Sequence, residues 1–431
     1  MDPWGIAVVA GLVIGYAAVS RRLERSVVSS AMVFVAGGLI VGPELLGWFD
    51  PGIGNEGVRA LAEATLTLVL FSDAARIDLV ALRRELAMPV RLLGIGLPLT
   101  IVAGTVAAVL VFPELIWAEA LVLAIVLAPT DAALGQAVVS DKRLPSRVRQ
   151  SLNVESGLND GICVPLLLIA LAIAEAEEKA FGGGHAVRIV FEEIGYGLLG
   201  GVAAGVIAAS LLRYAQSRRL VAEDWLQVIP LAAAALAYGI AVPLGGSGFI
   251  AAFVGGLVFG GLEIRGRGEV TYLTDATGLV LAAVTFVVFG ASALSDTLHV
   301  VGWQMVLYAV LSLTMIRMVP VWLALRGTHA RGPTVAFAGW FGPRGLASIV
   351  FAVLVLEGSE LEHVNLMIAT AVVTIAISVF GHGATAVPLT SAYVRWFEAQ
   401  SQPPAMESLP AAEIPWRREY PRDAEEAESG G

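Results

Sequence analysis

The sequence predicts an all-α protein that crosses a membrane many times, and three observations support this fold class. Of the 431 residues, 57% are hydrophobic and 15% are charged, whereas soluble domains carry about 25% charged residues. The mean hydropathy is +0.78. Apolar runs recur along the whole chain, and many reach the roughly 20 residues that a helix needs to cross a bilayer.

About thirteen apolar segments are expected to be transmembrane helices. The first is interpreted as a retained helix, because it lacks the basic leader and the small-residue cleavage site of a signal peptide. The others are delimited by loops that contain charged residues, glycine or proline. The thirteen ranges are 4–20, 28–42, 57–73, 92–112, 117–139, 152–174, 189–212, 225–243, 248–263, 277–293, 299–325, 333–356 and 364–389.

Basic residues in the loops predict the orientation. The loops after the odd-numbered segments carry eighteen arginines and lysines, whereas the alternate loops carry two. Because basic loops remain in the cytoplasm, we expect an external N-terminus and a cytoplasmic C-terminus in a prokaryotic plasma membrane. Residues 1–396 form the predicted membrane domain. Residues 397–431 contain five prolines and eight acids, a composition that predicts a disordered cytoplasmic tail.

Two segments are interrupted by proline. Pro129 precedes Thr130 and Asp131 in the fifth segment, and Pro343 precedes Arg344 in the twelfth. Proline lacks an amide N–H and disfavours a helical conformation in the residue before it, which frees carbonyl oxygens of the preceding turn. Interrupted helices at corresponding places in two halves indicate inverted repeats with a binding site near the membrane centre. Segments 1–6 and 8–13 would be these halves.

Ionisable residues inside or beside the apolar segments are candidate functional groups. Each costs about 2.5–3.5 kcal/mol at the membrane centre on insertion scales, so such residues indicate function by default. A set of structural ion pairs is the alternative, and it accounts poorly for the whole group. The residues are Asp73, Asp131, Glu155, Asp160, Arg317 and Arg344.

The sixth segment concentrates polar side chains on one helix face. Its positions 155, 156, 159 and 160 follow helical spacing, so Glu155, Ser156, Asn159 and Asp160 form one stripe. Together with the hydroxyl, carboxylate and freed carbonyls of the fifth segment, this stripe predicts a site made of oxygen atoms. Such a site suits a small alkali cation, and its carboxylates can also hold a proton. Glu155 would take no part in transport if Arg344 or Arg317 pairs with it.

Other cofactors are not expected. The single cysteine, Cys163, cannot form an intramolecular disulfide or a cysteine cluster, and the five histidines fall in loops or near segment ends. The alternating basic loops and the apolar composition favour lipid as the surroundings, and nothing in the sequence suggests a nucleic-acid partner.

Five short motifs resemble those of one family. They are LFSDAARID at 70–78, APTDAAL at 128–134, NVESGLNDG at 153–161, GFIAAFVGGLVFG at 248–260 and FGPRGLAS at 341–348. The sequence resembles sodium/proton antiporters of the NhaP type, in the branch of cation:proton antiporters shared with the eukaryotic sodium/proton exchangers. The resemblance covers residues from about 4 to 395.

The resemblance implies a thirteen-helix protomer with a six-helix transport bundle, a dimerisation domain, a homodimeric assembly, and crossed broken helices 5 and 12. It implies that Na⁺ or Li⁺ and a proton compete for Asp160. Asn159 would support the contact between helices 5 and 6, and Glu155 would pair with Arg344. The implied ligands are Asp131, Asp160, Ser156, Thr130 and Asp73.

Two departures from the family pattern leave the cation open. The acid of the third segment is often glutamate followed by Gly-Leu, but here Asp73 is followed by two alanines; proline often follows the Thr-Asp pair, but here Ala132 does. A K⁺/H⁺ antiporter of the same fold is therefore the alternative. In the family, asparagine before the essential aspartate accompanies electroneutral exchange, which is consistent with one cation replacing one proton.

Two rival functions explain the residues less well. A cation channel would need a continuous pore, often with repeated filters or rings of like charge, and the sequence shows one asymmetric cluster. An intramembrane protease could use two aspartates that share a proton, but the stripe of the sixth segment and Pro129 would then have no role. An enzyme is therefore not expected.

Overall fold

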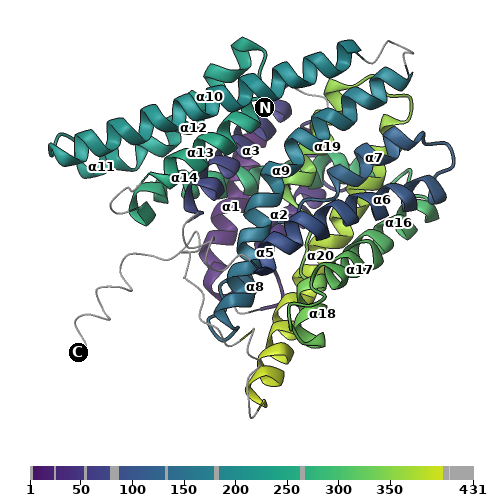
Figure 1. Ribbon diagram of the computed structural model, residues 1–431. Coiled ribbons are helices and arrows are strands. Elements are labelled where there is room, and N and C mark those ends of the chain that lie inside the picture. The colour runs from purple at the N-terminus through teal and green to yellow at the C-terminus, as the bar shows by residue number, and fades with distance from the viewer. Residues whose placement is uncertain are drawn as a thin grey trace. The chain divides into compact units, whose positions relative to one another are not determined.

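The computed structural model describes residues 3–23, 26–52, 56–77, 87–131, 134–178, 184–262, 267–400 and 407. Within these ranges all regular secondary structure is helical (Figure 1). The described residues form two compact units. Those of the first lie within 1–66, 85–191 and 280–411, and those of the second lie within 67–84 and 192–279.

Each of the thirteen predicted segments coincides with a helix or with consecutive helices, which confirms the predicted all-α fold class. Among the described residues, seven helices are long and apolar enough to cross a membrane, and five shorter helices of 10–17 residues are also apolar. Large aliphatic side chains on these helices are exposed, including Ile14 at 69%, Leu110 at 75% and Leu199 at 67%. Hydrocarbon surroundings solvate such side chains, so these faces are suited to contact with lipid.

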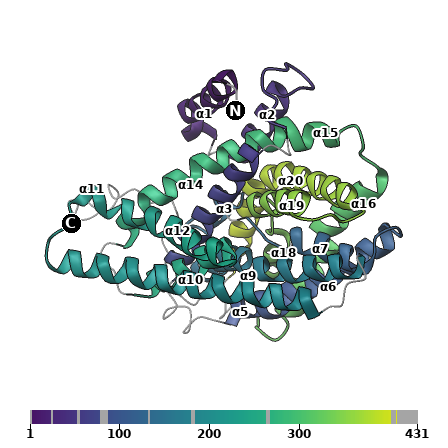
Figure 2. The same ribbon diagram turned by 90° about the horizontal axis from the view of Figure 1, so that it is seen from above.

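Helices of the first unit surround two interruptions. Helices α6 and α7 pack against each other, α7 packs on α9, and α20 packs on both α16 and α19 (Figures 1 and 2). The elements that lie wholly within this unit are α1 (Pro3–Leu23), α2 (Ser30–Val41), α5 (Ala87–Arg91), the π-helix Leu92–Gly96, α6 (Leu97–Val111), α7 (Trp117–Val126), α8 (Gln136–Val139), α9 (Ser146–Glu178), the π-helix Gly290–Leu294, α15 (Ser295–Thr297), α16 (Trp303–Leu313), α17 (Met315–Ala324), α18 (Gly332–Trp340), α19 (Leu346–Gly358) and α20 (Val364–Glu398).

The second unit is held together by close helix contacts at glycine. An added Cβ at Gly201 or Gly205 of α10 would lie 2.6 Å from a main-chain oxygen of α13, so these helices approach more closely than larger side chains would allow. Helices α11 (Glu223–Leu226), α12 (Val228–Ala241) and α13 (Gly248–Gly261), with the 3₁₀ turn Val242–Leu244, lie within this unit, whereas α3 (Glu56–Arg76), α10 (Gly184–Ser217) and α14 (Arg267–Phe289) continue from one unit into the other.

A buried ion pair in the second unit was not predicted. Asp275 of α14 pairs with Arg76 of α3 and also accepts a hydrogen bond from Ser72. The carboxylate is almost fully enclosed, with 4% of its side chain exposed. The apolar segment predicted at 277–293 leaves out residues 267–276, but α14 begins at Arg267. Because Asp275 pairs with Arg76 of α3, α14 can contain this charged residue, which a prediction from hydropathy alone leaves outside the helix.

Two described residues of the predicted tail, Gln400 and Glu407, contact the region around Arg331. Helix α20 ends at Glu398, and most of the predicted tail, residues 401–406 and 408–431, lies outside the described residues. Glu407 is buried, and its carboxylate accepts hydrogen bonds from the Arg331 amide at 3.1 Å and the Thr334 hydroxyl at 2.7 Å. Arg331 is the N-cap residue of α18 and Thr334 lies in its first turn, so a tail residue caps the N-terminus of this helix.

Candidate functional site

The two interrupted helices meet at Asp131. Helix α7 ends at Val126, α18 ends at Trp340 and α19 begins at Leu346. The Asp131 amide donates to the carbonyl of Pro343 at 2.7 Å, and the Leu346 amide donates to Asp131 Oδ2 at 2.8 Å. The first amide of α19 thus holds the carboxylate, as expected at a helix N-terminus. The predicted breaks at Pro129 and Pro343 are confirmed, and they contact each other.

Glycine at position 345 permits this contact. A Cβ added at Gly345 would collide with the Asp131 carboxylate and would lie 2.6 Å from a methyl carbon of Leu134. The position therefore has no room for a side chain unless Asp131 moves. The second glycine of the Gly-Pro-Arg-Gly motif is thus required by the lack of room for a side chain and not by backbone flexibility.

The polar stripe of α9 reaches the first break. Ser156 donates a short hydrogen bond to the carbonyl of Thr130, and Asn159 Nδ2 donates to the Thr130 hydroxyl at 2.6 Å. Asp160 lies one turn after Ser156 on the same face. The side chains of this stripe are buried, with 7% of Asp160 exposed, and Asp131 is also buried, at 9%. The predicted residues Thr130, Asp131, Ser156 and Asn159 are thus brought together.

Glu155 pairs with Arg317. Arg317 Nη1 lies 2.6 Å from Glu155 Oε1, and both side chains are 3% exposed. The expected pair of Glu155 with Arg344 is therefore wrong. Arg317 stands near the start of α17, which begins after a kink at Thr314, and this kink was not predicted from the sequence.

Arg344 has a different role in the structure. Its Nη1 donates to the carbonyls of Ala128 and Pro129, with a distance of 3.1 Å to Pro129. The carbonyl of Ala128 belongs to the turn before Pro129, whose oxygens were expected to be free for the cargo. Arg344 is fully buried, so its positive charge lies at the broken C-terminal end of α7, where it compensates the helix dipole. The carbonyls of Ala128 and Pro129 already accept hydrogen bonds from this guanidinium.

A small pocket opens onto the site. It is lined by Thr130, Asp131 and Ser156 together with Gly135, Val138, Val139, Leu152, Phe341 and Pro343. Asp160 is not part of this lining. Within the described residues, no three His, Cys, Asp or Glu side chains converge as metal ligands. A cation at this place would thus need hydroxyl or main-chain oxygens beside the carboxylates.

Asp73 is described within the second unit. It lies in α3, near Ser72 and Arg76, and is half-buried. Its role as a ligand stays a prediction. Ala132, the departure beside Asp131, lies outside the described residues.

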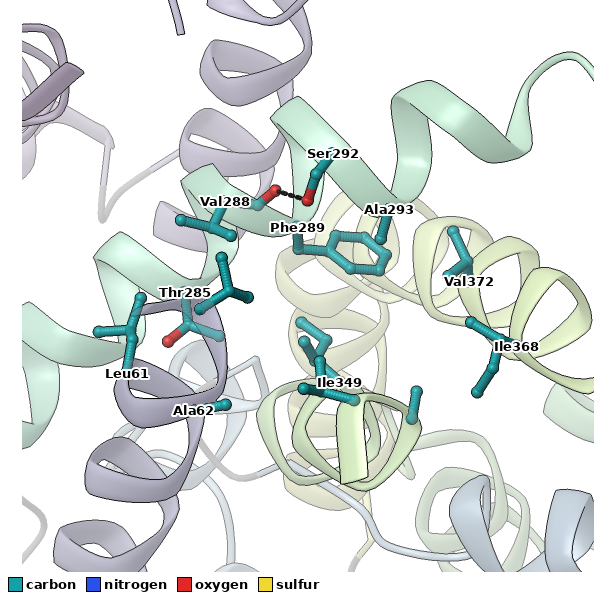
Figure 3. A pocket seen from close by; sticks show the side chains of 13 residues that line it. Leu61, Ala62, Thr285, Val288, Phe289, Ser292, Ala293, Ile349, Ile368 and Val372 are labelled. Carbon is teal, nitrogen blue, oxygen red and sulfur yellow. Dashed lines mark hydrogen bonds between the residues drawn. The ribbon is translucent and has the colours of Figure 1, made fainter. Parts of the chain in front are cut away.

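A larger pocket of the first unit has a different character. It lies between α3, α14 with the π-helix that follows it, α19 and α20 (Figure 3). Its two hydroxyl groups donate to carbonyls of their own helix, Thr285 to Leu281 at 2.9 Å and Ser292 to Val288 at 2.8 Å. The remaining lining is apolar, so this pocket does not suit a cation. The lining residues are Val58, Leu61, Ala62, Thr285, Val288, Phe289, Ser292, Ala293, Ile349, Ala352, Val353, Ile368 and Val372.

Two polar residues of α20 were missed. Ser378 and His382 contact the second break, at Arg344 and Trp340 respectively. His382 is near the end of the predicted segment 364–389, whereas α20 continues for sixteen residues beyond it, to Glu398. Their spacing of four residues was the available signal, because it puts both on one helix face.

Comparison with known proteins agrees with this architecture. The family model described as "Sodium/hydrogen exchanger, transmembrane" matches residues 8–392. Similar proteins include the K(+)/H(+) antiporter NhaP2 of Shewanella oneidensis, 25% identical over 80% of this chain and 60% of that protein. A Na(+)/H(+) antiporter of Schizosaccharomyces pombe is 25% identical over 58% of this chain and 57% of its own length. The chain thus spans about 60% of the length of such relatives.

A solved structure shows the same fold. The sodium proton antiporter MjNhaP1 from Methanocaldococcus jannaschii superimposes with a TM-score of 0.71, over 88% of this chain and 98% of that chain, at 19% sequence identity. At this identity the likeness concerns the fold. The family model, by contrast, matches nearly the entire membrane part, including the fifth, sixth and twelfth segments that form the site. The chain therefore belongs to the transmembrane sodium/hydrogen exchanger family.

Proposed function

We propose that this chain is a secondary-active antiporter that exchanges a monovalent cation for a proton by alternating access. The observation that carries the proposal is the meeting of two broken helices with the α9 stripe, in which Thr130, Asp131 and Ser156 line a small buried pocket. Carboxylate, hydroxyl and main-chain oxygens are ligands that a hard cation prefers. A carboxylate in this place can hold either the cation or a proton, and this is what exchange requires.

The residues that bind the cargo are proposed by excluding the charged side chains that already have partners. Arg317 neutralises Glu155. Arg344 donates hydrogen bonds to the carbonyls of Ala128 and Pro129, just after the end of α7. Asp131 receives an amide hydrogen bond from Leu346, so we assign it as a ligand whose position is fixed. Asp160 is then the residue at which cation and proton compete, with Asp131 as its coordinating neighbour. Asp73 is proposed as a further ligand from α3.

Na⁺ or Li⁺ is the proposed cargo, and exchange is proposed to be electroneutral. With one titrating carboxylate, one cation entering replaces one proton leaving, so no net charge moves. K⁺ is the second candidate, because the Shewanella oneidensis relative is named as a K(+)/H(+) antiporter and Asp73 and Ala132 depart from the family pattern.

The proposal includes the cellular setting. The eighteen-to-two bias of basic residues between alternate loops supports a plasma membrane protein with its N-terminus outside and its C-terminus in the cytoplasm. A homodimer, with a six-helix transport bundle and a dimerisation domain in each protomer, is proposed by likeness to the family.

Exchange in proteoliposomes tests this function. With an imposed pH gradient, external Na⁺ or Li⁺ should drive saturable proton movement, and K⁺ should be tested in the same way. If K⁺ is not a substrate, clamping the voltage with valinomycin and K⁺ should leave the rate unchanged. An uncoupled current would instead indicate a channel, and the absence of flux with all three cations would contradict the proposed function.

A further inference from the structure

Helix α20 presents two buried polar side chains to the break between α18 and α19. Ser378 is fully buried and His382 is 2% exposed. The Arg344 amide donates to Ser378 Oγ at 2.6 Å, and His382 Nε2 lies 3.0 Å from the carbonyl of Trp340. Trp340 is the last residue of α18, and Arg344 precedes the start of α19. The two side chains therefore contact both ends of the break.

Two carbonyl oxygens lie at hydrogen-bond distance from the His382 imidazole, that of Trp340 beside Nε2 and that of Ser378 beside Nδ1. A carbonyl only accepts, so His382 Nε2 carries the proton that is donated to Trp340. In a neutral imidazole with this proton, Nδ1 is an acceptor; it lies 3.1 Å from both oxygens of Ser378, and of these only the hydroxyl can donate to it. The hydroxyl donates to Nδ1 while its oxygen accepts from the Arg344 amide. A chain of three hydrogen bonds thus runs from Arg344 through Ser378 and His382 to Trp340.

The contrast with neighbouring hydroxyls shows that this arrangement is specific. Thr370 donates to Leu366 and Thr374 donates to Thr370, so each is satisfied within α20 itself, at 2.7 and 2.8 Å. Ser378, one turn later, instead joins the break to His382. Packing alone would require only an aromatic ring at 382, where the imidazole lies 5.1 Å from the Trp340 ring.

We propose that Ser378 and His382 are positioning residues for cation binding, an inference that rests on the proposed function. They act through the break and do not touch the cargo. The break they hold supplies the Pro343 carbonyl and the Leu346 amide that fix Asp131. Releasing Trp340 or Arg344 lets this segment relax, which moves the Asp131 carboxylate away from its place beside Thr130 and Ser156.

Transport kinetics separate positioning from a general loss of structure. His382→Phe keeps an aromatic ring but loses both hydrogen bonds, and Ser378→Ala removes the acceptor of the Arg344 amide. Each should raise the apparent KM for Na⁺ or Li⁺ about tenfold, the size expected when one or two buried hydrogen bonds are lost, with a nearly unchanged maximal rate. His382→Gln, which can still donate to Trp340, should recover part of the affinity. Thr374→Val is the matched control and should retain the wild-type KM.

Hydrogen–deuterium exchange supplies a readout that does not depend on transport. In the purified full chain, the amides of residues 341–347 should lose protection in His382→Phe and Ser378→Ala but not in Thr374→Val. Unchanged protection would overturn the proposal whatever the transport assay shows, as would a lower maximal rate with an unaltered KM. A wild-type protein without exchange would instead contradict the proposed function, while the protection data would still decide whether α20 holds the break.

Discussion

Replacing Asp160 by asparagine is expected to abolish cation/proton exchange while the protein remains folded. Asparagine keeps the shape of the side chain but can neither titrate nor supply a negative charge. Asp160 lies on the same face of α9 as Ser156, and it is 7% exposed, so the substitution also removes a buried charge. Thermal unfolding of the purified protein should therefore occur at the wild-type temperature or above it.

Asp141→Asn is the matched control for this substitution. Asp141 lies in the loop between α8 and α9, where it pairs with the exposed Arg143 at 2.6 Å. Surface pairs of this kind contribute little to stability, and the residue has no part in the proposed site. Exchange by this control should be close to that of the wild type. Measurable exchange by Asp160→Asn would show that another group carries the proton.

Removing one partner of the Glu155–Arg317 pair is expected to destabilise the protein strongly. Either single substitution, Glu155→Gln or Arg317→Gln, leaves a buried charge without its counter-charge, which costs about 3–5 kcal/mol. The double substitution removes both charges and should recover part of this loss. The measurement is the thermal unfolding midpoint of each variant in one detergent.

Arg344 provides the discriminating comparison. Its guanidinium bonds the carbonyls of Ala128 and Pro129, so Arg344→Gln should not relieve the effect of Glu155→Gln. Recovery in the pair with Arg317 but not in the pair with Arg344 is the predicted pattern. If Arg344→Gln restored stability to Glu155→Gln and Arg317→Gln did not, the pairing described here would be wrong.

Local features of the site could be predicted from the sequence. Proline at 129 and 343 acts on its own turn of helix, so the two breaks are visible without knowledge of the fold. The stripe of Ser156, Asn159 and Asp160 follows from helical period alone. The structure confirms both breaks and places Ser156 and Asn159 against Thr130.

Partner choice across helices could not be predicted in this way. Arg317 and Arg344 carry the same charge, and which of them reaches Glu155 depends on the rotation and register of three helices. The kink at Thr314, which precedes Arg317, has no proline or glycine to indicate it. The burial of Asp275 was missed for a related reason. Hydropathy counts this residue as charged, and it carries no information about the pairing with Arg76 that allows the carboxylate to be buried.

The carbonyls of the first break illustrate a further limit. Pro129 indicates that carbonyl oxygens lose their helical hydrogen bonds, but it does not indicate which groups then donate to them. Arg344, which is more than two hundred residues later in the chain, accounts for those of Ala128 and Pro129, and Ser156 donates to that of Thr130. The site therefore depends more on Asp131, Asp160 and the hydroxyl of Ser156 than the sequence alone suggests.

Competition between cation and proton is the central claim, and the pH dependence of wild-type kinetics tests it most directly. Initial rates of exchange should be measured over a matrix of Na⁺ or Li⁺ concentrations and pH values on the side of cation entry. If both ions bind Asp160, the apparent KM for the cation should rise as the pH falls, and saturating cation should restore the maximal rate. A constant KM with a maximal rate that falls with pH would place the proton at a separate group and contradict the mechanism.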